Sequence, residues 1–505
     1  MKKVWEELSL KEFQTIVKDK KSVKIDEELM SKLGENYLFL STFCEDKIIY
    51  GVNTGFGPMA QYRISNSDRV QLQYNLIRSH SSGSGDLLPV EFIRAAMLAR
   101  LNSLLKCKSG VHISVIETLC ELLNKEIYPV VFEHGGVGAS GDLVQLSHIA
   151  LVLIGEGEVI YKGERRTTLE VFQNEKIHPI EIKLREGLAL INGTSVMTGI
   201  GLINLDRAQN LLRWSVNCSS LINELVGAYD DHFSEELNSV KLHAGQSEIA
   251  RMIRDHLADS QLTKKRHEHL YTGKVNEMFF QEKVQEFYSL RCVPQILGPV
   301  YDTFIETEKV LINELNSAND NPIIDHEKQQ VFHGGNFHGD YIALEMDKMR
   351  LAVTKTSMLA ERQLNFLLNS RLNDVLPPFV NRKTLGLNFG LQGTQYTATS
   401  TTAENQMLSN SMYVHSIPCN NENQDIVSMG TNAALLTNKT IENTFEVISV
   451  ELITIVQAVR HLKINKFLSQ KSQQIISSFD EIIPDILEDK PLYPIIEKVK
   501  NAIKK

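Results

Sequence analysis

The stretch GIGLINLDRAQNLLRWSVNCSSLINELVG at residues 199–227 decides the fold class of this chain. Its apolar residues recur at the spacing of an amphipathic helix, and the stretch runs past the usual length of one. Further long stretches of this kind are found at 295–316, 341–370, 397–409 and 431–461. Helices this long, with few strong breakers, predict a parallel or antiparallel helical bundle whose outer faces meet other subunits.

The sequence before this stretch predicts shorter helices joined by glycine-bearing loops. Apolar residues follow helical spacing at 68–79, 90–105 and 113–123. Glycine lets a loop backbone take positive φ, and the loops are YGVNTGFG at 50–57, SSGSGD at 81–86 and HGGVGASGD at 134–142. The segment EVIYKGERR at 158–166 alternates around Lys162 and Gly163, which predicts a small hairpin.

We therefore expect a mainly α fold in which β structure is limited to small hairpins. The 505 residues exceed what one hydrophobic core usually organises, and no repeat, low-complexity tract or flexible linker divides them. The expected organisation follows chain order: an N-terminal helix-and-loop region at 1–195 that carries the loop at 134–142, a central long-helix bundle at 196–465 and a peripheral C-terminal segment at 466–505.

Charge, the N-terminal stretch and the length of the apolar runs limit which partners and which cellular compartment we expect. A formal net charge of −9, without a stripe of Lys and Arg interleaved with aromatic residues, argues against nucleic acid as a partner. The start, MKKVWEELSLKEF, has acidic residues where a signal peptide needs an apolar stretch. The longest apolar run, 146–154, falls short of the ~20 residues of a membrane helix. We expect a cytoplasmic protein that does not bind membranes, with its six cysteines as reduced thiols.

The loop at 134–142 contains the tripeptide Ala139-Ser140-Gly141, directly before a helix for which Asp142 is the expected N-cap. Alone, such a tripeptide is most economically a flexible loop. In a tight bend, however, the Gly141 nitrogen can attack the Ala139 carbonyl carbon, because glycine has no Cβ to obstruct ring closure. Loss of water and dehydration of Ser140 then give a methylidene-imidazolone. This group is an electrophile that no ordinary side chain provides, and it can accept an amine.

The segment GGVGASGDLVQLSHIALVLIGEGE at 135–158 closely resembles the signature of the histidine, phenylalanine and tyrosine ammonia-lyase family, in which Ala-Ser-Gly becomes this prosthetic group. Between about residues 48 and 430, six further motifs carry the resemblance in a consistent order: YGVNTGFG, LQYNLIRSHSSG, EGLALINGT, YSLRCVPQ, NDNP and NQDIVSMG. The overall pattern is nearest to bacterial tyrosine ammonia-lyases.

The resemblance implies an aspartase/fumarase-like helical fold and a homotetramer whose active sites combine residues from several chains. It also implies the cofactor 4-methylidene-imidazole-5-one (MIO), formed autocatalytically from Ala139, Ser140 and Gly141. The implied reaction, carried out by a carbon-nitrogen lyase, is the non-oxidative elimination of ammonia from an aromatic amino acid.

Elimination removes a weakly acidic β-proton, so a base must lie beside the electrophile. In YGVNTGFG the resemblance implies Tyr50 as this base, with Gly57 lining a close backbone approach. A tyrosine serves as a base only where neighbouring donors or a positive field stabilise its phenolate.

The resemblance assigns Arg291, in YSLRC, to the substrate carboxylate, which a guanidinium holds by a two-pronged pair. Tyr288, three residues earlier on the same helical face, is expected to hydrogen-bond near the reacting centre, and Gln285, one turn before Arg291, to point into the same cavity. Asn192, in LINGT, is expected to donate a hydrogen bond to the carbonyl of the prosthetic group. Phe337, in GGNFHGD, packs against the substrate or the prosthetic ring, or else is an ordinary core aromatic.

The sequence supports neither a metal site nor a nucleotide site. Two histidine pairs lack carboxylates or thiols at a recognised ligand spacing: His333 with His338, and His267 with His269. The glycine-rich loops lack both GxxxxGK(S/T) and a strand-embedded GxGxxG. The NDNP segment at 319–322 is expected to fix a turn.

Two sites bear on the substrate. Ser79 and His80 lie where the family reads the substrate side chain, and this Ser-His pair, common in histidine ammonia-lyases, favours histidine. Gln424, preceded by Asn423, stands where histidine lyases have a glutamate, and a neutral amide offers no charge to an imidazole substrate. Asn-Gln is the pattern of the phenylalanine and tyrosine enzymes, and His80 can meet a tyrosine hydroxyl. We therefore favour tyrosine, giving 4-coumarate, with histidine, giving urocanate, as the alternative.

Two further interpretations stay open. An aminomutase would return the amine to the β-carbon, and that outcome depends on how long mobile loops, such as those around Tyr50 and Tyr301, enclose the product. A non-catalytic structural relative would have kept the fold and lost the chemistry. The intact tripeptide, Tyr50 and Arg291 argue against the second.

Overall fold

The computed structural model describes residues 2–4, 7–273, 276–280 and 283–505. Met1, Trp5 and Glu6 lie outside the described residues. They belong to the N-terminal stretch whose acidic residues argue against a signal peptide. Helices dominate the described chain and strands form only small sheets, so the expected mainly α fold class is confirmed. Within the described residues, no helix has both the length and the apolar character needed to cross a membrane.

Packing divides the chain into two compact units, and each is built from three separate segments. The first unit consists of Met1–Asn204, Thr307–Asp347 and Ser411–Thr437. The second consists of Leu205–Glu306, Lys348–Asn410 and Asn438–Lys505. The division into 1–195, 196–465 and 466–505 followed chain order and stays a prediction about folding domains.

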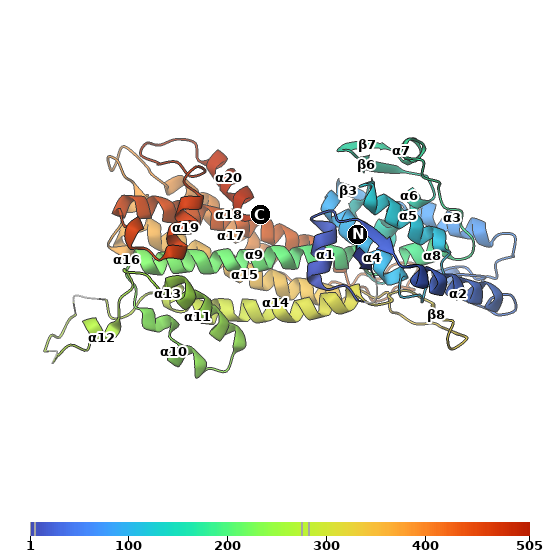
Figure 1. The fold of residues 1–505 in the computed structure, drawn as a ribbon, viewed down its shortest axis with the longest axis horizontal. Coiled ribbons are helices and arrows are strands. Elements are labelled where there is room, and N and C mark those ends of the chain that lie inside the picture. Colours follow the sequence, from blue (N-terminus) through green and yellow to red (C-terminus); the bar gives the residue numbers. More distant parts are fainter. Residues whose placement is uncertain (1, 5–6, 274–275, 281–282) are drawn as a thin grey trace. The chain divides into compact units, whose positions relative to one another are not determined.

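The first unit is made mostly of short helices, and small strand pairs such as β6 and β7 lie at its edge (Figure 1). Its helices are α1 (Leu10–Val17), α2 (Glu27–Phe43), α3 (Arg69–His80), α4 (Val90–Leu104), α5 (Ile113–Asn124), α6 (Leu143–Leu153), α7 (Thr168–Glu175) and α8 (Glu186–Ile191). Its strands are β1 (Lys2–Val4), β2 (Val23–Ile25), β3 (Ser84–Leu87), β4 (Tyr128–Pro129), β5 (Phe132–His134), β6 (Glu158–Tyr161), β7 (Glu164–Thr167), β8 (Ile323–Asp325) and β9 (Gln330–Phe332).

The strands are more varied than the hairpins expected from the sequence. The hairpin predicted at 158–166 is present as β6 and β7, and β4 joins its edge to make a three-stranded antiparallel sheet. β8 and β9 form a second hairpin. The parallel pair β1 and β2 and the antiparallel pair β3 and β5 join strands with a helix or another strand between them. Such pairs lack the tight-turn signal by which a hairpin is recognised in a sequence.

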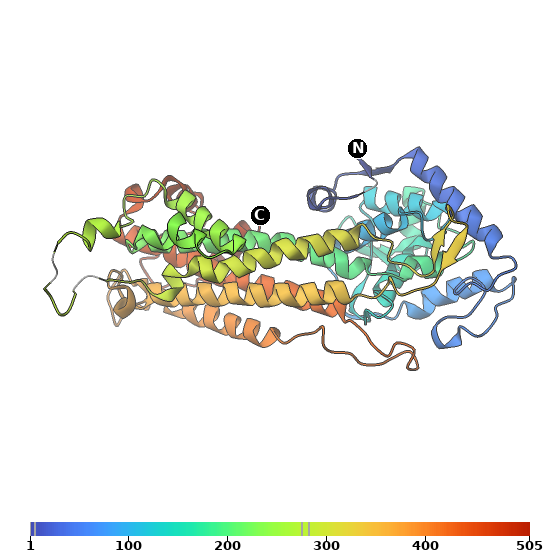
Figure 2. The same cartoon turned by 90° about the horizontal axis from the view of Figure 1, so that it is seen from below.

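Four long helices begin in one unit and end in the other: α9 (Ser195–Leu225), α14 (Val293–Leu315), α15 (Asp340–Leu368) and α18 (Gly430–Leu462). Within the second unit, parts of these helices run side by side in both views (Figures 1 and 2). The other helices of this unit are α10 (Glu235–Ser239), α11 (Ala244–Leu257), α12 (Arg266–His269), α13 (Tyr288–Arg291), α16 (Ser370–Asn373), α17 (Gln392–Leu408), α19 (Gln470–Ser478) and α20 (Tyr493–Ile503). The long helices predicted from the sequence are therefore present.

Two expectations about local structure are wrong. Tyr301 lies inside α14 and not on a mobile loop, as the helical spacing of that stretch itself indicated. Gln285 does not lie one helical turn before Arg291, because α13 begins at Tyr288 and the preceding Phe287 has an extended backbone, with φ −60° and ψ 155°. Gln285 therefore belongs to the segment that enters the helix.

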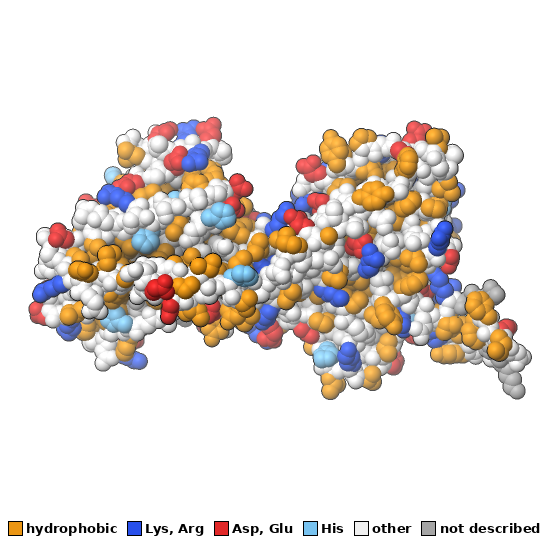
Figure 3. All heavy atoms as spheres, turned by 180° about the vertical axis from the view of Figure 1, so that it is seen from behind, with side chains coloured by type: hydrophobic (Ala, Val, Ile, Leu, Met, Phe, Trp, Pro, Cys, Tyr) orange, Lys and Arg blue, Asp and Glu red, His pale blue; other side chains and the backbone are white. Residues whose placement is uncertain are grey.

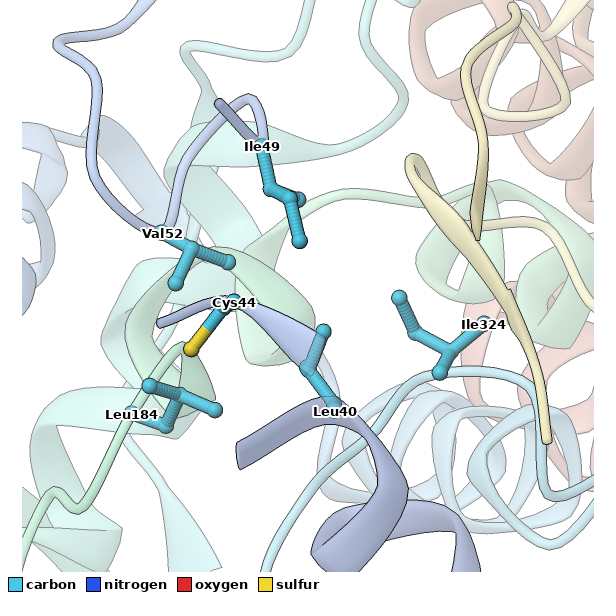
Figure 4. Packing of buried hydrophobic residues seen from close by; sticks show 6 residues of the cluster. All are labelled: Leu40, Cys44, Ile49, Val52, Leu184 and Ile324. Carbon is cyan, nitrogen blue, oxygen red and sulfur yellow. The ribbon is translucent and has the colours of Figure 1, made fainter. Parts of the chain in front are cut away.

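A small hydrophobic cluster anchors the loop that carries Tyr50. Ile49 and Val52 flank this tyrosine closely and are fully buried. They pack with Leu40 and Cys44 of α2 and its C-terminal end, with Leu184 and with Ile324 of β8 (Figure 4). Burying apolar side chains on both sides of Tyr50 fixes the loop's path, so the tyrosine is held by the core of the first unit.

Candidate active site

A cavity of about 480 Å³ lies beside the tripeptide and is lined wholly by residues of the first unit. The sequence-predicted residues that line it are Tyr50, Gly57, Ser79, His80, Ser140, Asn192, Phe337 and Gln424. Its apolar wall is made by Phe56, Met59, Ala60, Leu72, Leu76, Leu143, Leu188 and Ile191. An apolar wall with a few convergent polar groups is typical of a site that binds a small molecule.

Two amide side chains hold Ser140 at this cavity. Gln424 Nε2 donates to the Ser140 hydroxyl oxygen at 3.0 Å, and Asn192 Nδ2 donates to the Ser140 carbonyl oxygen at 3.1 Å. Gln424 is held in turn by Cys419, whose thiol donates to Gln424 Oε1 at 3.3 Å and whose backbone pairs with it. Because the thiol bonds the carbonyl end of this amide, the donor end faces Ser140.

The position of Gly141 admits no larger residue. Its φ is +76°, and a Cβ built there would lie 2.0 Å from the carbonyl oxygen of Gly193. The same carbonyl oxygen accepts the Asp142 N–H at 2.8 Å, so the chain after the tripeptide lies directly against the chain after Asn192. Glycine is required here both for its backbone conformation and for this close approach.

A buried arginine supports the chain around Asn192. Arg100 donates to the carbonyl oxygens of Ala189 and Asn192, the latter at 2.9 Å, and to Asn319 Oδ1 at 3.3 Å. Burial lowers the pKa of Arg100 to about 10, so the guanidinium stays charged at neutral pH. The guanidinium donates to backbone carbonyl oxygens, and these hydrogen bonds fix the backbone beside the tripeptide.

A second buried arginine holds the NDNP segment. Arg185 Nη1 lies 3.0 Å from Asp320 Oδ2, with both side chains fully buried, and Arg185 Nη2 donates to the Asn321 carbonyl oxygen at 2.9 Å. Asn321 in turn lines the cavity and accepts the Gly334 N–H at 2.8 Å through its Oδ1. This segment therefore positions one wall of the site.

Asp142 occupies the expected N-cap position of α6, but its side chain caps a different helix. Its Oδ2 accepts the N–H groups of Val196 and Met197, at 2.8 Å and 3.0 Å, in the first turn of α9. Its Oδ1 accepts the hydroxyl of Thr431, in the first turn of α18. Burial raises the pKa of this carboxyl to about 6, against the opposing effect of these three donors. One carboxyl thus ties the tripeptide to two long helices.

The phenol oxygen of Tyr50 accepts the backbone N–H of Gly57 at 3.0 Å. Gly57 has a φ of +53°, and a Cβ there would lie 2.7 Å from Nδ2 of Asn420, another residue of the cavity lining. The backbone of Tyr50 is held by His333, whose Nε2 accepts the Tyr50 N–H at 3.3 Å. Burial lowers the pKa of His333, which suits a neutral ring with an accepting nitrogen.

Ser79 and His80 lie at the C-terminal end of α3, where both line the cavity. His80 Nδ1 lies 3.0 Å from the Leu76 carbonyl oxygen, which can only accept, so Nδ1 carries the proton. In the neutral ring, Nε2 then keeps its lone pair. The Ser79 hydroxyl donates to the same carbonyl oxygen at 3.1 Å and lies 3.0 Å from Nδ1.

The carbonyl oxygen of Ala139 lies 3.0 Å from Nδ1 of His338. The other ring nitrogen, Nε2, lies 3.3 Å from Oδ2 of Asp340, the first residue of α15. The tripeptide is therefore held by three parts of the chain: His338 contacts Ala139, Gln424 contacts Ser140, and the segment 192–193 contacts Ser140 and Gly141.

Three of the expected site residues belong to the second unit and do not line this cavity: Gln285, Tyr288 and Arg291. Gln285 is exposed, and Tyr288 is 69% exposed. The Arg291 guanidinium carbon lies 4.8 Å from the centre of the Tyr288 ring. Among the residues described, no partner bonds Arg291 Nε, although this atom is buried.

Comparison with known proteins places this arrangement in a family. The family model "Aromatic amino acid lyase" matches residues 8–481. The chain belongs to the aromatic amino acid lyase family. It is therefore an enzyme of the carbon-nitrogen lyase type that acts on small aromatic amino acids. The family predicted from the sequence motifs is confirmed.

Relatives within the lyase family carry different names. The chain is 41% identical to a tyrosine 2,3-aminomutase of Chondromyces crocatus over 90% of this chain and 87% of that protein. It is 38% identical to a histidine ammonia-lyase of Caldanaerobacter subterraneus over 96% and 93%. The solved structure of a Pantoea agglomerans phenylalanine aminomutase matches with a TM-score of 0.96 and 33% identity, covering 100% of this chain and 98% of that one.

The structure adds residues to this lyase-family site that the sequence reasoning missed. The sequence suggested His338 only as a metal ligand and Cys419 only as one of six reduced thiols, and it gave no role to Asn420. Their contacts with Ala139, Gly57 and Gln424 have no local signal, because His338 and Ala139 are 199 positions apart. The GGNFHGD stretch, with a histidine after glycines, was the one available hint for His338. Within the described residues, no three His, Cys, Asp or Glu side chains gather as a metal site, and the six cysteines are free thiols.

Proposed function

We propose that this protein eliminates ammonia from L-tyrosine to give 4-coumarate, acting as a cytoplasmic homotetramer. Its electrophile would be MIO, formed autocatalytically from Ala139, Ser140 and Gly141. The observation that carries the proposal is the set of donors gathered on this tripeptide at a cavity: Gln424 on the Ser140 hydroxyl, Asn192 on the Ser140 carbonyl and His338 on the Ala139 carbonyl.

The residues present fit this prosthetic group. Ring closure at the nitrogen of residue 141 requires that no Cβ obstruct it, and the Gly193 carbonyl oxygen leaves no room for one. Among the described residues, the buried Oδ1 of Asn192 has no partner, so this amide can adjust while Nδ2 keeps its bond to the Ser140 carbonyl. When bound, the group supplies an electrophilic methylidene carbon to which the substrate amine can add.

Tyr50 is proposed as the base that takes the β-proton. A phenolate is stabilised by a donor on its oxygen, and the Gly57 N–H donates there. A backbone donor is fixed by the loop and costs little reorganisation when charge develops on the oxygen. Asn192 donates to the Ser140 carbonyl oxygen, and in the mature group this hydrogen bond would strengthen the electron demand of the methylidene carbon.

The environment of His80 favours a phenolic substrate. Because Nδ1 is committed to the Leu76 carbonyl, the lone pair on Nε2 can accept the hydroxyl hydrogen of tyrosine. Phenylalanine has no such donor and would leave this nitrogen unpaired. Gln424 is bonded to Ser140 and carries no charge, so it offers an imidazole substrate no carboxylate. We therefore favour tyrosine over phenylalanine and histidine.

Arg291, Tyr288 and Gln285 are proposed to reach the cavity of another subunit. The Arg291 guanidinium is suited to a carboxylate, and its Nε has no partner among the described residues. The segment before α13 is covered with exposed apolar side chains, visible at the lower right of Figure 3; they are Tyr271, Met278, Phe279, Phe280, Val284 and Phe287. Contiguous exposed apolar surface marks an interaction site. Arg291 of the partner subunit would then hold the substrate carboxylate.

A tyrosine 2,3-aminomutase is the second candidate, because the relative from Chondromyces crocatus at 41% identity carries that name. Both activities begin with the same elimination and use the same residues in this chain. They differ in whether the amine is returned to the β-carbon before the product leaves. Histidine ammonia-lyase is a further candidate, through the relative from Caldanaerobacter subterraneus.

The test offers the purified protein L-tyrosine, L-histidine and L-phenylalanine separately. The conjugated acids are followed by ultraviolet absorbance, and β-amino acids are separated by chiral chromatography. We expect 4-coumarate to form fastest. Faster urocanate formation would replace tyrosine by histidine as the substrate, and β-tyrosine as the main early product would establish the aminomutase. An intact mass equal to the encoded mass, instead of two waters less, would overturn the prosthetic group.

A further inference from the structure

We propose that His338, backed by Asp340, catalyses the closure of the prosthetic ring at Ala139. The inference rests on the proposed function, since it concerns how the chain makes the electrophile assigned to it above. It gives His338 a task that precedes any encounter with substrate.

The turn that carries His338 is attached to the tripeptide loop. The Gly339 N–H donates to the Gly138 carbonyl oxygen at 3.0 Å, and the His338 N–H donates to the Gly335 carbonyl oxygen at 3.0 Å. These bonds fix the backbone on both sides of the imidazole. Nδ1 consequently lies 3.0 Å from the carbonyl oxygen of Ala139, the group whose carbon the Gly141 nitrogen must attack.

Both nitrogens of the His338 ring face acceptors. The Ala139 carbonyl oxygen can only accept, so Nδ1 must donate to it. Oδ2 of Asp340 lies 3.3 Å from Nε2 and also accepts. A ring that carries protons on both nitrogens satisfies both contacts, and such a ring polarises a carbonyl more strongly than a neutral one.

This geometry matches the needs of the first step. As the Gly141 nitrogen bonds to the Ala139 carbon, negative charge develops on the carbonyl oxygen, and Nδ1 donates its proton there. The oxygen leaves as water with one proton from the Gly141 nitrogen and one from the Ser140 nitrogen, and a C=N bond forms between the Ala139 carbon and the Ser140 nitrogen. His338 regains a proton, so no other reactant is consumed. The second water comes from the Ser140 hydroxyl and its α-hydrogen.

Other contacts hold the loop when this one is removed. The Ser428 hydroxyl donates to the Gly138 carbonyl oxygen at 3.1 Å, and Asn192 donates to the Ser140 carbonyl oxygen at 3.1 Å. The loop is therefore tied on both sides of Ala139 without the imidazole. His338 is also partly exposed, with 27% of its side chain accessible, so replacing it empties no core. A variant at this position is expected to fold.

The test measures how fast newly made full-length chain becomes lighter by two waters, using intact mass at fixed times after a short pulse of synthesis. We expect His338→Ala to convert about 100-fold more slowly than the parent, the size of effect a placed proton donor has. Added imidazole should restore part of the rate. Asp340 is a positioning residue, so Asp340→Asn should slow conversion less, and Asp340→Glu should recover it. His178→Ala, at an exposed histidine, is the matched control.

The outcomes separate the two proposals. A parent chain that keeps its encoded mass overturns the proposed function. If the parent loses two waters and His338→Ala loses them equally fast, the role of His338 is overturned and the proposed function is not. Thermal unfolding of each variant identifies one that fails to fold; a slow variant that unfolds like the parent and is rescued by imidazole supports the role. If His338→Ala does not fold, His338→Gln, which keeps size and an N–H donor without charge, takes its place, and parent-like conversion by it counts against an imidazolium donor.

Discussion

The Gly57 N–H donates to the phenol oxygen of Tyr50 across 3.0 Å, so the two ends of the loop at 50–57 meet at the atom proposed to take the substrate proton. Ile49 and Val52 anchor one end of this loop in the core, and Asn420 packs against the other. The proposed base therefore lies on a loop that is fixed at both ends.

Tyr50→Phe removes the proposed base and keeps the ring. We expect kcat to fall about 100-fold or more, as for loss of a placed general base, while the chain still becomes two waters lighter. Steady-state kinetics and intact mass on the same sample check this. Tyr62→Phe, at a 70% exposed tyrosine of the neighbouring loop, is the control. Parent-like turnover by Tyr50→Phe would exclude Tyr50 as the base.

Gly57→Ala should disturb the same loop by a different route. The added Cβ meets Asn420 Nδ2 at 2.7 Å, and the φ of +53° is unfavourable for alanine. Gly163→Ala shares a positive φ, +82°, but has nothing within 4 Å, so it isolates the backbone strain. The backbone strain should lower the stability of each variant by about 1 kcal/mol, Gly57→Ala should lose more because of the added contact, and only Gly57→Ala should lose activity. Equal activities would mean that the contact with Asn420 does not matter.

Cys419→Ala removes the thiol that orients the Gln424 amide. Without it the amide can turn its carbonyl toward Ser140, and we expect turnover to fall about 2- to 10-fold, the worth of one hydrogen bond. Cys419→Ser restores a donor and should recover most of the rate. Alkylating the free thiol in the parent should lower turnover, while alkylated Cys419→Ala keeps its own rate. A serine variant no better than the alanine variant would argue for packing instead of orientation.

His80→Ala should weaken discrimination and not chemistry. If Nε2 accepts the tyrosine hydroxyl, the variant loses an interaction worth about 1 to 3 kcal/mol, so kcat/KM for tyrosine falls roughly 5- to 150-fold. The value of kcat/KM for phenylalanine changes little or rises. Competition between the two amino acids in one vessel measures the ratio directly. A parallel loss for both substrates would mean that His80 shapes the site without reading the hydroxyl.

Because Glu451 is a buried carboxyl group, we expect the stability of the protein to depend on pH. Glu451 lies on α18 in the second unit and is wholly buried, with the Cys218 thiol beside its carboxyl group. Burial raises its pKa well above the ordinary value of 4.5. The folded chain therefore binds this proton when the unfolded chain has lost it, so the free energy of unfolding falls as pH rises above about 4.5.

Glu451→Gln removes this titration, so its unfolding midpoint should decline less than that of the parent as pH rises from 5 to 8. Glu488→Gln, at a largely exposed glutamate, should follow the parent. Thermal unfolding of the three chains over that pH range checks the difference. Curves for Glu451→Gln and the parent that stay parallel would show that Glu451 does not titrate differently on folding.

A structural feature could be predicted from the sequence when the residues that specify it lie close together along the chain. The long helices α9, α14, α15 and α18 were predicted within a few residues, because apolar periodicity is written along each helix. The same holds for the β6 and β7 hairpin around Lys162 and Gly163. The pairing of β3 with β5 was not predicted, since the two strands are separated by α4, α5 and β4.

The sequence by itself determined the fold class, the family and the chemical kind of each candidate residue, because these depend on side-chain identity and on order along the chain. Only the tertiary structure decided which atoms face each other: that Asp142 caps α9 instead of its own helix, that Gln424 reaches the Ser140 hydroxyl, and that His338 faces the Ala139 carbonyl. Hydrogen bonds act over about 3 Å, and nothing in a local pattern specifies which distant residues the packing of helices and loops brings within that range.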